Sequence, residues 1–236
     1  ETPEVMDTAQ YVFEVAPKQY LTYDTVSTEH GKLICIVPDF KNVVMDMVCG
    51  SIPDANNDSI VMAFAGAYTG DPNKTGHMNI AGKHVSGGKL YPGYSCNRNG
   101  GAFTWSDASG PQFFYNDYAH ELARAAEEGG MGFAQEMMIH EGEEKITKRK
   151  PTERCVFRAI CLNKDGKFAI YENTEKVEFG TFTKALLADG VTEALYTDMG
   201  TGWNYCFYRQ QEGDKAKFLH WVPRKEASNF IVLKVR

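Results

Sequence analysis

The stretch A-L-Y-T-D-M-G-T-G-W-N-Y-C-F-Y-R, residues 194–209, is the pattern around which the rest of the chain is organised. A short apolar run leads to one acid, Asp198, and then to the glycine-rich segment of Gly200, Thr201 and Gly202. In such an arrangement a strand fixes the acid, and the glycines let backbone N–H groups approach a ligand without a Cβ between them. The same residues also describe an ordinary hairpin turn that Asp198 would simply cap. The stretch alone leaves both interpretations open.

Length and composition are typical of a globular chain with one full core. The 236 residues are 43% hydrophobic and 12% aromatic, and the formal net charge is −6 without a basic stripe. This composition argues against nucleic acid as a partner, because such a surface is basic. No apolar run is long enough for a membrane-spanning helix. The chain begins Glu-Thr-Pro-Glu, so we expect a mature form that has lost its targeting segment, with an upstream lipid anchor as an open alternative.

The six cysteines form neither a zinc pattern nor a disulfide scaffold, because they are spread along the chain without a C-x-x-C pair. Cys155 and Cys161 fall in one expected strand, which would hold them roughly 20 Å apart, too far to bridge. We expect most of the six to be buried thiols. His77, His84 and His140 lack the i, i+4 spacing of a metalloprotease, so the sequence gives a zinc site little support.

Short apolar runs rich in β-branched residues outnumber helical patterns along the chain. Helices are expected over residues 117–128, with Asp117 as N-cap and Gly129 beyond the end, and over residues 181–189. Because the strands cluster in hairpins and do not alternate with helices, we predict a single α+β domain with a large mixed β-sheet and a few short helices. Strands are expected over residues 32–37, 43–49, 59–68, 101–105, 112–115, 132–140, 154–162, 167–171, 191–197, 203–209, 217–222 and 229–235.

Three further segments are interpreted from their composition. Residues 1–32 are an N-terminal segment, with an edge strand as one option, and residues 33–236 form the domain itself. Residues 69–101 are rich in Gly and Asn and lack periodicity, and a loop of that length is usually functional or mobile. Residues 141–151 are charged and basic, and we interpret them as a solvated loop.

The order of parts over residues 158–236 resembles the phosphodiester glycosidase family. A strand with an arginine, R-A-I-C-L-N-K-D-G, stands where the family has R-T-A-I-G before a D-x-x-G turn. A short helix follows, and then A-L-Y-T-D-M-G-T-G stands where the family has A-x-N-L-D-G-G-G-S. Pro223 and Arg224 match the family's P-R before the final strand. Upstream, residues 61–68 stand where the family has A-x-N-G-G-F-F, so the resemblance spans about residues 33–236.

The resemblance implies a hydrolase that cleaves a glycosyl phosphodiester or a related glycan, as a secreted, periplasmic or cell-surface protein. Its ligand would be a carbohydrate or a glycosyl phosphate, and a divalent cation is an option at the site. Asp198 would act as general base, sugar-hydroxyl anchor or metal ligand, and Glu136, in an apolar strand, would act as an acid. The remaining candidates bind substrate through guanidinium groups, a backbone cradle or an aromatic face; they are Arg158, Arg224, Gly200, Thr201, Gly202 and Tyr68.

Departures from the family motifs favour a second hypothesis, a non-catalytic glycan- or phosphate-binding surface protein on the same fold. Met199 and Thr201 replace glycines of D-G-G-G-S, and Ala65 stands where the family has the Asn of N-G-G. Asn99-Gly100-Gly101 is a rival for that Asn, and Arg154 is a rival for the family arginine. A cleft that joins Asp198, Glu136 and an arginine would favour the enzyme. An Asp198 that only caps its own turn at the surface would weaken it.

Overall fold

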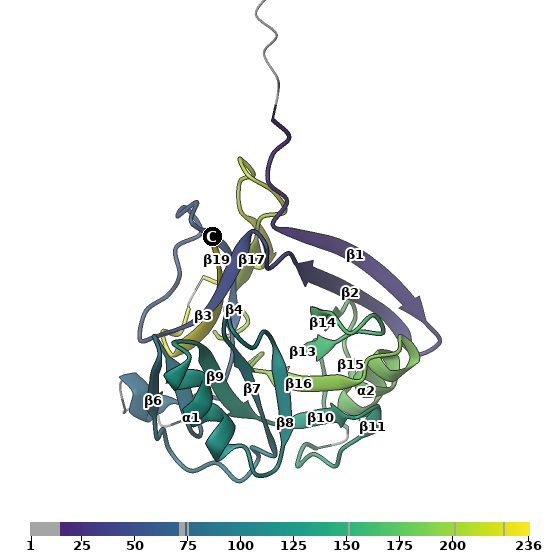
Figure 1. Ribbon diagram of the computed structural model, residues 1–236. Coiled ribbons are helices and arrows are strands. Elements are labelled where there is room, and N and C mark those ends of the chain that lie inside the picture. Colours follow the sequence, from purple (N-terminus) through teal and green to yellow (C-terminus); the bar gives the residue numbers. More distant parts are fainter. Residues whose placement is uncertain (1–14, 71–73, 75, 151, 201, 224) are drawn as a thin grey trace, which may run out of the picture.

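A computed structural model describes residues 15–70, 74, 76–150, 152–200, 202–223 and 225–236. Its described strands form three larger sheets and one two-stranded pair, and two α-helices pack beside them (Figure 1). The predicted α+β single domain is confirmed. Every pair of named strands is antiparallel, and the strands are divided among separate sheets where one large mixed sheet was expected.

The seven-stranded sheet includes the predicted hairpin and has β1 at its edge. β13 pairs with β14 across the N-K-D-G turn, from Arg158 opposite Glu172 to Leu162 opposite Phe168. The helix α2 (Phe179–Ala188) packs its apolar face against this sheet and contacts β2. The strand order is β1 (Leu21–Thr28), β2 (Gly31–Pro38), β14 (Phe168–Asn173), β13 (Arg158–Leu162), β16 (Glu193–Thr197), β10 (Met137–His140) and β11 (Glu143–Glu144).

The first five-stranded sheet is built around β4 (Ile60–Ala65), the near-continuous apolar run expected to be a central strand. β4 pairs with β17 (Cys206–Tyr208) on one side and with β19 (Asn229–Val235) on the other. The outer strands are β18 (Lys217–His220) and β3 (Val43–Cys49). Five of the six residues of β4 are buried, as a central strand covered on both faces requires.

The second five-stranded sheet takes two of its strands from the long segment expected to be structureless. Residues 69–101 contain the 3₁₀ turn η1 (Gly76–Asn79) and the strands β5 (His84–Ser86) and β6 (Lys89–Tyr91). The strand order is β6, β5, β9 (Met131–Gln135), β7 (Gly101–Trp105) and β8 (Gln112–Tyr115). The helix α1 (Ala119–Glu127) contacts this sheet. A separate two-stranded pair joins β12 (Arg154–Cys155) to β15 (Val177–Glu178).

Three local predictions differ from the structure, and the first is the strand over residues 154–162, which divides into β12 and β13 in separate sheets. Tyr118, rather than Asp117, is the N-cap of α1, and it makes no side-chain capping bond. The expected strand over residues 132–140 breaks at Glu136, because β9 and β10 belong to different sheets. Beyond the helix, Gly129 adopts φ 68°, the left-handed conformation expected after a helix end.

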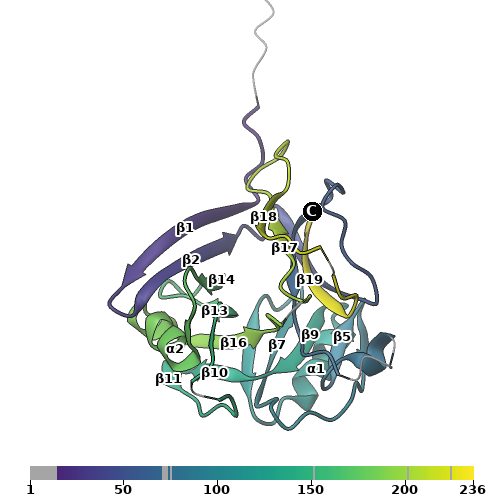
Figure 2. The same ribbon diagram turned by 180° about the vertical axis from the view of Figure 1, so that it is seen from behind.

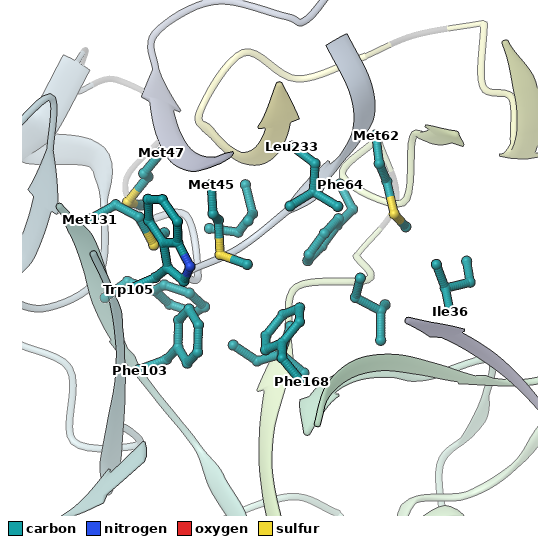
Figure 3. Packing of buried hydrophobic residues seen from close by; sticks show 14 of the residues in the cluster. Ile36, Met45, Met47, Met62, Phe64, Phe103, Trp105, Met131, Phe168 and Leu233 are labelled. Carbon is teal, nitrogen blue, oxygen red and sulfur yellow. The ribbon is translucent and has the colours of Figure 1, made fainter. Parts of the chain in front are cut away.

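The three larger sheets enclose one shared core, so they form one domain (Figure 2). Figure 3 shows residues from all three sheets in contact across it. The labelled members are Ile36, Met45, Met47, Met62, Phe64, Phe103, Trp105, Met131, Phe168 and Leu233. All six cysteines are free, and three of them are buried. Among the described residues, no helix is long and apolar enough to span a membrane.

Candidate functional site

Asp198 directly follows β16 and lies where the seven-stranded sheet meets the sheet that contains β4. Its backbone N–H donates to the carbonyl of Gly66 at 2.9 Å, and Gly66 directly follows β4. The residue is only 8% exposed, and its Oδ1 accepts the Gly200 N–H at 3.0 Å. Burial raises the pKa of the carboxyl, against the opposing effects of the Gly200 and Thr69 N–H groups and of Arg149. Asp198 is therefore a buried acid biased toward its protonated form.

The glycine segment after Asp198 is not a hairpin turn. β16 belongs to the seven-stranded sheet and β17 pairs with β4 in another sheet, so the segment carries the chain between sheets. Gly202 within it is buried and adopts φ 88°. The Trp203 N–H donates to the Gly200 carbonyl at 2.9 Å, which keeps the segment compact. Asp198 does cap this segment through Gly200, but it does so inside the protein rather than at its surface.

Glu136 occupies the break between β9 and β10 and is 1% exposed. Its carbonyl accepts the Tyr196 N–H at 3.0 Å, which ties the break to β16. Its Oε2 accepts the Tyr68 hydroxyl at 2.5 Å and the Arg149 Nε–H at 3.0 Å. Its Oε1 is buried without a hydrogen-bond partner among the residues that the structure describes. That oxygen can accept a hydrogen bond from a hydroxyl group of a ligand or from water.

Arg149 lies in the loop that follows β11 and forms a cluster of polar side chains with Glu136 and Tyr68. Its Cζ lies 3.9 Å from the centre of the Tyr196 ring and 4.7 Å from that of Phe179. Its Nη2 donates to the Tyr68 hydroxyl at 2.5 Å. Burial opposes the charge of Arg149, but Tyr196, Tyr68 and Glu136 together outweigh burial and raise its pKa. A permanent positive charge therefore lies beside Glu136 and within electrostatic range of Asp198.

Sequence reasoning missed Arg149, because it treated residues 141–151 as a solvated basic loop. Spacing does not distinguish it from the lysines around it. The available signal was chemical: Arg149 is the one arginine of that run, and a guanidinium pairs with carboxylates and stacks on aromatic rings better than an ammonium does.

Two tyrosines connect the charged groups. The Tyr68 and Tyr196 ring centres are 5.7 Å apart, and the Tyr196 hydroxyl accepts the Met199 N–H at 3.1 Å. Burial raises the pKa of Tyr196 to about 12 and also raises that of Tyr68. Both phenols therefore remain neutral hydrogen-bond donors near neutral pH. Tyr68, predicted to stack on a sugar, lies with its hydroxyl between Glu136 and Arg149.

Open space reaches the cluster from the surface. A cavity of about 100 Å³ is lined by Glu136, Arg98 and Lys148, and the Arg98 guanidinium lies 5.7 Å from the centre of the Tyr68 ring. Arg149 lines an adjoining hollow of about 390 Å³. Three cationic side chains therefore border the space around Glu136.

A larger hollow of about 500 Å³ is lined by Tyr94 and Asn99, among others. Burial, Cys96 and Asp198 raise the pKa of Tyr94. This hollow therefore comes within electrostatic range of Asp198. Asn99 belongs to the N-G-G triplet, so the rival for the family Asn lines this hollow. Its Oδ1 is buried without a hydrogen-bond partner within the described part of the chain.

The structure brings together Asp198, Glu136, Tyr68 and Gly200 but places Arg158 elsewhere. Arg158 is fully buried, and its Nε and Nη2 donate to Glu172 Oε2 at 3.1 and 2.9 Å. Its guanidinium lies 5.7 Å from the centre of the Phe64 ring, in the core. The rival Arg154 is exposed and donates to the Lys176 carbonyl. Thr201 and Arg224 lie outside the described residues.

The two acids do not form a metal site by themselves. Among the residues that the structure describes, neither belongs to a group of three His, Cys, Asp or Glu side chains within reach of one ion. A divalent cation at this position stays a prediction.

No protein-family model and no curated protein sequence matches the chain. Solved structures do match it. The catalytic domain of zebrafish N-acetylglucosamine-1-phosphodiester alpha-N-acetylglucosaminidase, auto-inhibited by its pro-peptide, superimposes with a TM-score of 0.59 at 13% identity. The match covers 95% of this chain and 86% of that domain.

The two chains share a fold.

A hypothetical protein from Synechocystis also matches, with a TM-score of 0.56 at 11% identity. That match covers 92% of this chain and 62% of the Synechocystis protein. At these identities the similarity concerns the fold and leaves the chemistry to be argued from the site itself.

Proposed function

We propose that this protein is a hydrolase of a glycosyl phosphodiester or a related glycan, with its active site at Asp198, Glu136 and Arg149. The observation that carries the proposal is the convergence of two buried acids and a half-buried arginine from three separate segments of the chain. Buried charged groups destabilise a fold unless they are paired, so their concentration at one place favours a functional role. The shared fold with a phosphodiester glycosidase catalytic domain supports the substrate class.

The two acids take different roles in this proposal, because their environments differ. Burial favours the protonated form of Asp198, which suits a general acid that protonates the departing phosphate oxygen. Glu136 is ion-paired with Arg149 and keeps Oε1 free. It would stabilise positive charge at the sugar carbon or activate water. These roles exchange those expected from the sequence, where Glu136 was the acid.

Cationic side chains would hold the phosphate of the substrate. Arg149 still has N–H groups beyond those that donate to Glu136 and Tyr68. Arg98 and Lys148 border the same space. A phosphodiester carries one negative charge, which two or three cations at this distance would bind and orient. The proposal also includes a secreted or cell-envelope location, which fractionation of the source cells would test.

One observation favours a binding protein as the second candidate. Arg149 already donates to Glu136 and Tyr68 and lies against the Tyr196 ring. With these contacts, Arg149 would position its loop rather than bind substrate. In that case the surrounding hollows would bind a glycan or a phosphate without cleaving it.

Hydrolysis of a panel of sugar-1-phosphodiesters, with and without divalent cation, tests the proposal. We expect Asp198→Asn and Glu136→Gln each to lower kcat by at least about 100-fold. The control is Glu193→Gln, an acid on β16 that pairs with His140 and should retain activity. The binding protein is the correct alternative if wild type cleaves no member of the panel, while wild type and the folded variants bind the same sugars.

A further inference from the structure

Three side chains with nitrogen or sulfur donors converge where β3 meets the segment of residues 69–101. Cys49 is the last residue of β3, His77 lies in η1, and His84 is the first residue of β5. Their potential ligand atoms all lie within 4.8 Å of one another. His84 is buried, and the other two are half-buried. β3 and β5 belong to two different sheets that contact each other here.

The hydrogen bonds of the two imidazoles leave a ring nitrogen directed at the cluster. His84 Nδ1 lies 3.0 Å from the Gly82 carbonyl oxygen, which can only accept, so this nitrogen carries the proton. His84 Nε2 therefore has a lone pair, and it faces His77 Nδ1 at 2.9 Å. A carbonyl that binds the outer nitrogen of an imidazole is the arrangement found behind metal-bound histidines.

Packing holds the rings in these orientations. Tyr91 stacks on His77 with ring centres 3.4 Å apart and planes at 3°. The same Tyr91 pairs with His84 across β5 and β6. On the third side, Ser86 hydrogen-bonds the Cys49 thiol and donates to the Met47 carbonyl at 2.6 Å. The three donors are thus fixed by their neighbours before any ligand arrives.

We infer that Cys49, His77 and His84 form a binding site for Zn²⁺, with one sulfur and two nitrogen ligands and a fourth position left for water or another ligand. Zinc binds Cys sulfur at about 2.3 Å and His nitrogen at about 2.0–2.1 Å in a tetrahedron. Such bonds place neighbouring ligand atoms roughly 3.3–3.6 Å apart. To reach these distances the imidazole nitrogens would spread from 2.9 Å, and the thiol already lies within 4.8 Å of both.

The donor set also selects the class of metal. Mg²⁺ and Ca²⁺ require oxygen ligands, which this cluster does not offer. Thiolate and imidazole suit Zn²⁺ and other late transition metals. On binding, the metal replaces the proton of the Cys49 thiol, which passes to the solvent, and no oxidant or reductant is involved.

The site would fasten the start of the long loop to β3. Cys49 and His77 are 28 positions apart in the sequence, and a metal that joins them removes loop entropy from the unfolded chain. The same loop continues to Tyr94 and Arg98, which border the hollows near Asp198 and Glu136. The metal would act here as a structural clip, distinct from the chemistry of the candidate site.

Titration of the metal-free protein with Co²⁺, followed by competition with Zn²⁺, tests the inference. We expect one equivalent of Co²⁺ to give tetrahedral visible bands and a sulfur-to-cobalt charge-transfer band, both removed by Zn²⁺ but not by Mg²⁺. Cys49→Ser should abolish the charge-transfer band, and His77→Ala should weaken Zn²⁺ binding by at least about 100-fold. Both residues are half-buried, so these variants test the site with less risk to folding than changes at buried His84.

Matched controls are Cys96→Ser, a half-buried thiol elsewhere, and His120→Ala, an exposed histidine on α1. Both should bind Zn²⁺ as wild type does. The inference is overturned if the charge-transfer band is absent from wild type or persists in Cys49→Ser. It is also overturned if His77→Ala, shown to be folded by circular dichroism, keeps the wild-type affinity.

Discussion

The guanidinium carbon of Arg149 lies 3.9 Å from the centre of the Tyr196 ring, and this contact joins a charged loop to the strand that leads to Asp198. The Arg149 side chain is 12% exposed and that of its ion-pair partner Glu136 is 1% exposed. A pair this enclosed is scarcely screened by solvent. Arg149 therefore positions its loop and compensates a buried negative charge at the same time.

Arg149→Met should destabilise the fold by about 3 kcal/mol, because Glu136 would be left buried without its cation. Urea unfolding measures the change, and Lys148→Met, an exposed neighbour, should stay within about 0.5 kcal/mol of wild type. The double variant Arg149→Met/Glu136→Gln should recover part of the lost free energy of unfolding, which a double-mutant cycle measures. An Arg149→Met protein as stable as wild type would show that the pair is not the constraint inferred from its burial.

Asp198→Asn should be more stable than wild type at pH 7. Burial raises the folded-state pKa of Asp198 above its ordinary value of 3.8, so the ionised carboxyl costs stability as the pH rises through the folded-state pKa. The asparagine keeps an oxygen that can accept the Gly200 N–H and removes the charge. The advantage of the variant should shrink as the pH falls toward 4. An advantage independent of pH, or a loss of stability at pH 7, would contradict the raised pKa.

Glu172→Gln should cost about 3–5 kcal/mol at pH 7, because Arg158 would keep a fully buried charge without its partner. Burial alone would raise the pKa of Glu172, but Arg158 and His220 outweigh burial and lower it below 4.5. Wild type therefore has this stabilisation above about pH 4.5 and loses it as the pH falls through the folded-state pKa. When urea unfolding is measured from pH 7 to pH 3, the free energy of unfolding should fall less steeply with pH in the variant than in wild type. Glu175→Gln, an exposed acid nearby, should behave as wild type.

Asn229→Ala should destabilise the fold by about 2 kcal/mol or more, because two buried backbone groups would lose their partner. The Asn229 side chain accepts the Ala67 N–H at 2.8 Å and donates to the Ala67 carbonyl at 2.9 Å. These bonds fix the backbone directly before Tyr68, so substrate turnover or binding should also fall. Asn57→Ala, in an exposed turn, is the matched control. Unchanged thermal unfolding of Asn229→Ala would show that water replaces the side chain without cost.

Much of the fold could be predicted from the sequence where local patterns are strong. The apolar run containing β4, the hairpin of β13 and β14, and both helices follow from composition and turn residues. What the sequence could not show is which strands share a sheet, because partners such as β2 and β14 are far apart in the chain. The break at Glu136 was missed for the same reason, since both halves of that run are equally apolar.

The same limit applies to the candidate site, where local patterns identified some residues and missed others. Asp198 and Glu136 were identified because a strand pattern surrounds each of them. Arg149 was not, because its burial depends on aromatic rings contributed by β16 and α2. His77 and His84 looked unrelated for a similar reason, since the turn η1 that contains His77 and the strand β5 that begins at His84 were expected to be loop. Long-range packing decides both cases, and no local window contains it.

Glu136 and Asp198 are held by backbone bonds to β16 and to the residue after β4, whereas Arg98 and Arg149 come from connecting segments. The framework is intolerant of insertion, because a slip of one residue would turn each side chain to the other face. Connecting segments change length and composition freely. A change in these segments can therefore alter the cationic groups at the candidate site while the two acids keep their places.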